Sequence, residues 1–100
     1  MNRKKQNELF EAFVDRQKHI MLNKGIDYAN EDVLSNFKLS GNICGLTPEL
    51  NCLSLIATKV ARLGVLLNSK DSPKYESVED SIFDLANYAF LLSCLINDKD

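Results

Sequence analysis

The sequence predicts an all-α fold, a small bundle of about four helices. Apolar residues recur at intervals of three and four along several segments, which is typical of helices that bury one face. No segment alternates apolar and polar residues over the length of a strand, and the β-branched residues are scattered. With 100 residues, 45% of them apolar and 26% charged, the chain is expected to form one globular domain over residues 1–100.

The first half of the chain predicts one long and one short helix. Residues 1–24 have the spacing of an amphipathic helix, and Gly25 stands where a residue in the left-handed conformation would end it. Residues 26–45 predict a short helix inside a long connection, with Asn30 or Asp32 as its capping residue.

Two longer helices follow in the second half. Thr47-Pro48-Glu49 supplies a capping hydroxyl, a proline at the first helical position and an acid in the first turn, so a helix is predicted from here to about residue 67. Ser77, with Asp80 three residues later, predicts the start of a last helix that continues to about residue 96. Both helices have few polar positions, and a helix that is apolar on all sides must be buried on all sides. We therefore expect these two helices to form the interface of a homo-oligomer.

Charge, hydropathy and cysteine content narrow the function classes. With a net charge of −2 and a pI near 5.3, the chain lacks the positive charge that attracts the phosphates of duplex DNA or RNA. Duplex nucleic acid is therefore not expected as a partner. The longest apolar stretch, residues 85–96, is too short to cross a bilayer, and no signal peptide is recognised, so a cytoplasmic protein without a membrane partner is expected. Cys44, Cys52 and Cys94 are predicted to be reduced and buried as small apolar residues.

One polar constellation stands out in the two apolar helices. Asp80, Asp84 and Asn87 fall at i, i+4 and i+7 and share one stripe of the last helix. Lys59 and Arg62 share a face of the preceding helix and are almost its only charges. Two carboxylates one turn apart are best tolerated beside a cation, which is either a divalent metal ion or a basic side chain. The pattern fits a salt-bridge network between the helices and a ligand site equally well.

A second polar cluster surrounds Asp27 and Tyr28, where acids gather after the first helix. In so polar a turn, the ring of Tyr28 either covers the core or offers a flat face on which a nucleobase stacks.

Three segments together resemble a known family: KGIDYA at 24–29, KVARL at 59–63 and ESVEDSIFDLANYA at 76–89. Their order is similar to that in the nucleotide modification associated domain family of small phage and prophage proteins. That family is described with the MazG-like, all-α nucleoside triphosphate pyrophosphohydrolases. The resemblance makes residues 25–97 the family-like core. It implies that Asp27 and Tyr28 belong to a D-Y-G turn and that four residues belong to the polar core: Lys59, Arg62, Asp80 and Asp84.

The sequence departs from MazG-type enzymes in its acidic residues. Those enzymes bind magnesium through acidic motifs on two helices, whereas here Lys59 and Arg62 occupy the helix of the first motif and Ser81 stands three residues before Asp84. Two or three carboxylates remain to hold Mg²⁺: Asp80 and Asp84, joined in the enzyme alternative by one of Asp27, Glu31 and Asp32.

The resemblance implies a phage-type nucleotide-binding protein. We expect it to capture a nucleotide or a nucleotide-derived signal, such as a host defence messenger, in a polar pocket between helices or subunits. One alternative is a MazG-like, magnesium-dependent nucleotide pyrophosphohydrolase, and another is a helical interaction protein without a ligand. We expect the cationic side chains to bind the phosphate of the nucleotide, and the carboxylates to accept hydrogen bonds from its ribose hydroxyls or base. The expected nucleotide-binding residues are Asp27, Tyr28, Lys59, Arg62, Asp80, Asp84 and Asn87.

Overall fold

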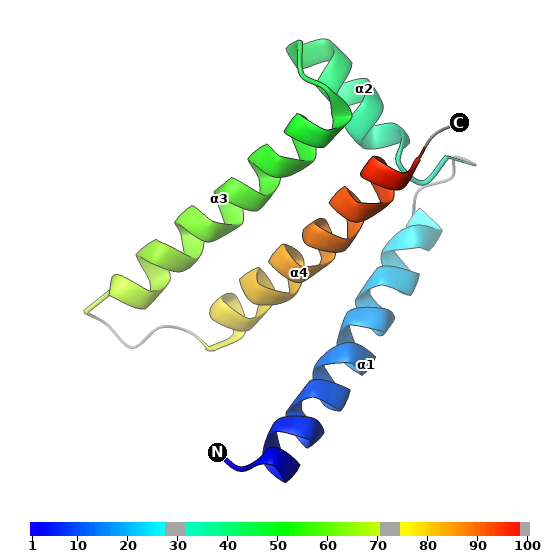
Figure 1. The fold of residues 1–100 in the computed structure, drawn as a ribbon. Helices are drawn as coiled ribbons and strands as arrows, with labels where there is room; N and C mark the ends of the chain where they lie inside the picture. The colour runs from blue at the N-terminus through cyan, green and yellow to red at the C-terminus, as the bar shows by residue number, and fades with distance from the viewer. Residues whose placement is uncertain (28–31, 71–74, 99–100) are drawn as a thin grey trace. The chain divides into compact units, whose positions relative to one another are not determined.

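The computed structural model describes residues 1–27, 32–70 and 75–98, and their regular structure is helical (Figure 1). The helices are α1 (Arg3–Asp27), α2 (Ser35–Cys44), α3 (Pro48–Asn68) and α4 (Tyr75–Asn97). The described residues include no strand, so the all-α prediction is confirmed. The chain divides into two units, Met1–Glu31 and Asp32–Asp100.

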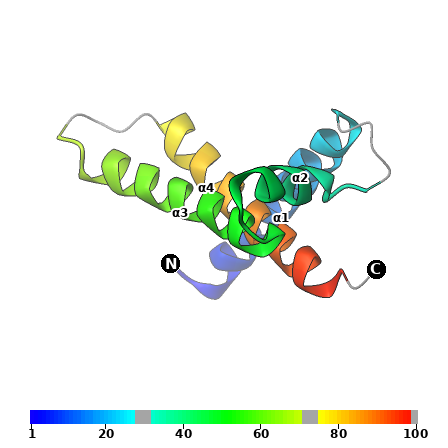
Figure 2. The same ribbon diagram turned by 90° about the horizontal axis from the view of Figure 1, so that it is seen from above.

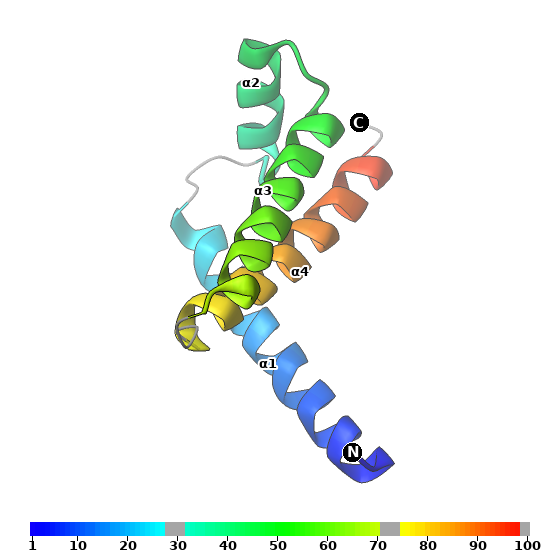
Figure 3. The same ribbon diagram turned by 90° about the vertical axis from the view of Figure 1, so that its left-hand side faces the viewer.

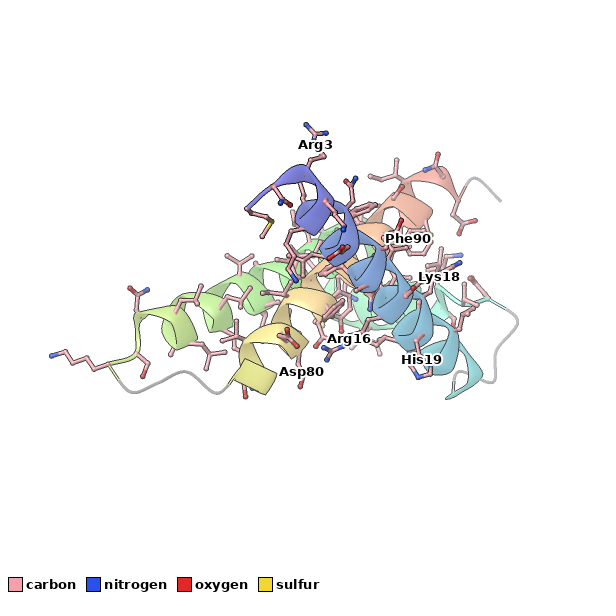
Figure 4. All side chains as sticks on the ribbon, turned by 90° about the horizontal axis from the view of Figure 1, so that it is seen from below. Arg3, Arg16, Lys18, His19, Asp80 and Phe90 are labelled. Carbon is pink, nitrogen blue, oxygen red and sulfur yellow. The ribbon has the colours of Figure 1, made fainter. Side chains whose placement is uncertain are left out.

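The first unit consists of the single helix α1. Asn2 begins it, because its Oδ1 accepts a hydrogen bond from the backbone N–H of Lys5 at 2.8 Å. The helix continues through Gly25 to Asp27, so the prediction that Gly25 ends it is wrong. Its amphipathic character is also weaker than expected, because polar residues such as Gln6 and Gln17 interrupt the apolar stripe. Lys18 and His19 are neighbouring polar side chains on this helix (Figure 4).

The short helix α2 begins without a side-chain cap. Leu34 precedes it, and Asp32 instead accepts a hydrogen bond from the backbone N–H of Leu34 at 3.0 Å, which forms a turn before the helix. Asp32 is therefore not the capping residue that the sequence suggested, and Asn30 lies outside the described residues. The helix ends at Gly45, whose φ of 72° is left-handed.

The two long helices start differently from one another. At α3 the prediction is confirmed, since Thr47 Oγ1 accepts a hydrogen bond from the N–H of Leu50 at 3.1 Å and Pro48 occupies the first position. Helix α4 begins at Tyr75, two residues before Ser77. Ser77 therefore lies inside the first turn and is not the helix cap that the sequence predicted.

Helices α3 and α4 run side by side in opposite directions, and α2 packs on the N-terminal part of α3 (Figures 1 and 2). Figure 3 shows α2 turned away from the axis of α3, and Gly45 ends α2 before the connection to α3. The buried centre of this unit consists of Leu34, Phe37, Cys52 and Leu95. Cys52 is fully buried, and its Sγ donates a hydrogen bond to the backbone oxygen of Tyr88 at 3.4 Å.

Two sequence expectations about burial need correction. Cys44 is exposed at the end of α2, while Cys94 is half-buried and Cys52 fully buried, so the three cysteines do not share one role. Leu91 and Leu92 on α4 pack against the buried centre of their own chain. The apolar stretch at residues 85–96 is thus partly covered without a second subunit.

Helix α3 has the length and composition of a membrane-spanning segment, and it is the one helix in the described residues that does. Only 6% of its most apolar window is buried in the structure. Lys59 and Arg62 stand near the middle of the helix, where charged side chains are least compatible with hydrocarbon.

A lysine bridges the two ends of the second unit. Lys38 Nζ lies 2.6 Å from Asp32 Oδ2 and 2.8 Å from Asp98 Oδ2. The hydrogen bonds from Lys38 and from the N–H of Leu34 lower the pKa of Asp32 below its usual 3.8. The hydrogen bonds to Asp32 and Asp98 raise the pKa of Lys38 above its usual 10.5.

These shifts predict how stability changes with acidity. The ionised Asp32 carboxylate stabilises the folded state fully above about pH 4, the region of its pKa in the unfolded chain. This stabilisation is lost as the pH falls through the lowered pKa of Asp32 in the folded state, while Lys38 stays charged throughout. Lys38→Met is therefore expected to lower Tm slightly at pH 7 and to have less effect near pH 2. Thermal melts by circular dichroism measure this difference, and Lys70→Met, a substitution of an exposed lysine after α3, is the control. An equal Tm difference at both pH values would contradict the assignment.

Candidate functional site

An ion pair joins α3 to α4 within the predicted polar constellation. Lys59 Nζ lies 3.1 Å from Asp84 Oδ2, and each of the two side chains is 26% exposed to solvent. The antiparallel packing of α3 on α4 brings these residues together, because each projects toward the neighbouring helix along the same edge. The prediction of a salt bridge between the two helices is confirmed for this pair.

Arg62 extends the positive charge along α3. It stands three residues after Lys59, and therefore on the same side of the helix, and is exposed. Within the described part of the chain its guanidinium forms no ion pair or hydrogen bond. Its planar group of five N–H donors is thus available to an external carboxylate or phosphate.

The three polar residues on α4 differ in exposure. Asp80 is exposed on the first turns of the helix (Figure 4), Asp84 is half-buried against Lys59, and Asn87 is only 5% exposed. Along one stripe of α4 the side chains therefore pass from solvent toward the interior. We call the set Lys59, Arg62, Asp80, Asp84 and Asn87 the α3–α4 polar edge.

Asn87 is the unusual member of the polar edge. Both atoms of its side-chain amide are buried, and neither has a hydrogen-bond partner among the described residues. Leaving a buried amide unpaired destabilises a protein by about 1–3 kcal/mol, so such groups are rare in native structures. The amide presents one acceptor and two donors side by side.

The polar edge does not fit a resident magnesium ion as it stands. Asp84 is already engaged by the ammonium group of Lys59, which a metal ion would have to displace. The described residues contain no group of three or more His, Cys, Asp and Glu side chains placed to hold a metal ion. Asp80 and Asp84 lie one turn apart on α4, as expected, and Asp84 forms an ion pair with Lys59.

Two predicted site residues, Asp27 and Tyr28, do not belong to the described part of the second unit. Asp27 is the last residue of α1 and belongs to the first unit, and Tyr28 lies outside the described residues. The structure therefore groups Lys59 with Asp84 and places Arg62, Asp80 and Asn87 on the same two helices. The sequence named Asn87 from its helical spacing, but its burial without a partner emerges only from the three-dimensional packing.

No protein-family model, curated protein or solved structure matches this chain.

Proposed function

We propose that the protein binds a nucleotide or a nucleotide-derived small molecule at the α3–α4 polar edge. The buried, unpaired amide of Asn87 is the observation that carries this proposal. A nucleobase edge pairs a donor with an acceptor, and a primary amide matches that pattern with two hydrogen bonds. A ligand of this kind would supply the partners that the protein itself does not provide for Asn87.

The cations of α3 support the same ligand class. Arg62 is exposed and unpaired within the described residues, and its guanidinium can grip a phosphate with two parallel hydrogen bonds. Lys59 is held in place by Asp84, so its charge is positioned before a ligand arrives. A phosphate on the cations and a base on Asn87 together define a nucleotide rather than a simple anion.

Capture without turnover is the form of the proposal that these contacts favour. A MazG-like hydrolase would need Mg²⁺ at Asp80 and Asp84, whereas Asp84 is paired with Lys59. The resemblance to phage proteins extends the proposal to a biological setting, in which the protein sequesters a nucleotide signal of host defence in the host-cell cytoplasm. The alternative, magnesium-dependent nucleotide hydrolysis, is an outcome of the test below.

The test is isothermal titration calorimetry of the purified protein with nucleoside mono-, di- and triphosphates and cyclic nucleotides. Each titration is run once in EDTA and once with magnesium, and the mixtures are analysed for product by chromatography. We expect at least one nucleotide to bind in EDTA and to be recovered unchanged. Magnesium-dependent release of phosphate or pyrophosphate would establish the hydrolase instead, and failure of every nucleotide to bind would reject the proposal.

Arg62→Ala is expected to weaken binding of that nucleotide at least about 10-fold, because a charge-assisted contact to phosphate contributes about 1.5–3 kcal/mol. Arg62→Lys keeps the charge but loses the planar pair of donors, so it should restore only part of the affinity. Lys70→Ala, which removes an exposed cation after the end of α3, is the matched control and should bind like the wild type. Since Arg62 is exposed, Tm should change little, and equal affinities for Arg62→Ala and the control would contradict its role.

A further inference from the structure

The α3–α4 polar edge carries a negative charge directly beside one of its two cations. Lys59 Nζ lies 3.1 Å from Asp84 Oδ2, and both side chains are partly exposed, so an anion from solvent can reach Lys59. Asp84 holds Lys59 in place and at the same time offsets part of its charge. An anion that binds Lys59 must therefore share this cation with a carboxylate.

Such sharing is unfavourable for a simple phosphate. Like charges repel with an energy that falls only as the inverse of their separation, and the repulsion is stronger at a protein surface than in bulk water. Inorganic phosphate and pyrophosphate consist of acceptor oxygens around a negative charge at neutral pH. They offer Asp84 repulsion and little hydrogen bonding in return.

Arg62 does not remove this disadvantage. It is exposed three residues after Lys59, and within the described residues its guanidinium has no ion pair or hydrogen bond. It can hold one phosphate group with two parallel hydrogen bonds. A phosphate held by Arg62 on this side of α3 still lies near the carboxylate that is paired with Lys59.

A nucleotide differs from a simple phosphate by the donors that it carries beside the phosphate. A ribose hydroxyl or an amino group of the base donates a hydrogen bond, and an ionised carboxylate is a strong acceptor of such bonds. The base also reaches for the amide of Asn87, which is 5% exposed and lacks a partner among the described residues. The same carboxylate is thus unfavourable for one class of anion and favourable for the other.

We propose that Asp84 selects the ligand of the polar edge. Its carboxylate repels a simple phosphate at Lys59 and Arg62, and it accepts a hydrogen bond from the sugar or base of a nucleotide. Specificity commonly depends on a repulsive element of this kind as well as on attractive contacts. The inference rests on the proposed nucleotide binding and adds to it a residue that excludes the competing anions.

The test is isothermal titration calorimetry of the full chain with sodium pyrophosphate, in EDTA and at low salt. We expect the wild type to bind pyrophosphate weakly and Asp84→Asn to bind it at least about 10-fold more tightly, because a neutral amide of the same shape replaces the repelling carboxylate. The variant should not bind the nucleotide more tightly than the wild type does. The ion pair is partly exposed, so the helical circular dichroism signal should be retained.

Asp98→Asn is the matched control. Asp98 is also paired with a lysine, at 2.8 Å from Lys38 Nζ, and its side chain is 25% exposed. The control removes the same charge from the chain outside the polar edge and should bind pyrophosphate like the wild type. Asp84→Glu keeps the carboxylate and should also bind it weakly. Adding Lys59→Met to Asp84→Asn should abolish the gain, because Lys59 is the cation that the first substitution releases.

The possible results separate this inference from the proposed function. If the wild type binds a nucleotide but Asp84→Asn gains no affinity for pyrophosphate, or gains no more than Asp98→Asn, the inference fails and nucleotide binding stands. Loss of magnesium-dependent pyrophosphate binding in Asp84→Asn would overturn it too, since Asp84 would then hold a metal ion. If no nucleotide binds the wild type, the proposed function fails and the inference fails with it.

Discussion

Phe37→Ala is expected to lower the free energy of unfolding by about 3–5 kcal/mol, a large part of the 5–15 kcal/mol that stabilises most domains. Phe37 is 8% exposed and belongs to the buried centre with Cys52 and Leu95. Its ring meets that of Tyr88 on α4 edge to face, with centroids 6.4 Å apart. A single side chain from α2 thus contacts both long helices, so its loss leaves a cavity where three helices meet.

Urea unfolding followed by circular dichroism measures this effect. Leu39→Ala is the matched control, because Leu39 stands on the same helix but is 63% exposed. The control is expected to change the free energy of unfolding by no more than about 0.5 kcal/mol. Similar values for the two variants would show that α2 does not contribute to the core as described.

Asn87→Leu is expected to raise the free energy of unfolding by about 1–3 kcal/mol. The substitution keeps the branching of the side chain and removes the buried donors and acceptor that have no partner among the described residues. The same change should abolish binding of any nucleotide that the wild type binds, because the proposed contact to the base is lost. Gain of stability with loss of binding is the pattern expected of a residue retained for a ligand.

Thermal melts and calorimetry on the same preparations test both halves of this prediction. Asn97→Leu is the control on the same helix, since Asn97 is exposed and its Nδ2 donates a hydrogen bond to the backbone oxygen of Ser93 at 2.8 Å. That variant should gain no stability and should bind normally. A loss of stability in Asn87→Leu with unchanged binding would assign Asn87 a structural role.

Local patterns predicted the fold class and one helix end well. The start of α3 depends on residues adjacent in sequence, Thr47, Pro48 and Glu49, and the hydrogen bond from Leu50 to Thr47 follows from that geometry alone. The prediction failed at Gly25 and Ser77, where helices continue through residues that often mark an end. Capping preferences are worth about 1 kcal/mol, so longer-range packing overrides them easily.

The sequence was enough to predict which residues belong to the candidate site, but not which of them contact one another. Helical spacing was enough to place Asp80, Asp84 and Asn87 on one stripe, and the two cations on the facing helix suggested an ion pair. Which cation meets which acid depends on how far α3 slides along α4, and only the packing determines that Lys59 meets Asp84. The isolation of the Asn87 amide likewise depends on every neighbour at once.

The helix order in the second unit has a consequence for how fast it folds. α2 packs on α3 and α3 packs on α4, so each helix contacts the helix next to it in the chain. Proteins with mainly local contacts close short loops first and fold within microseconds to milliseconds. The ring contact between Phe37 and Tyr88 and the ion pair between Lys38 and Asp98 instead join residues far apart in the sequence. The ion pair joins the two ends of the unit. It can form only once both helix pairs are in place, so removing it should speed unfolding and leave the folding rate unchanged.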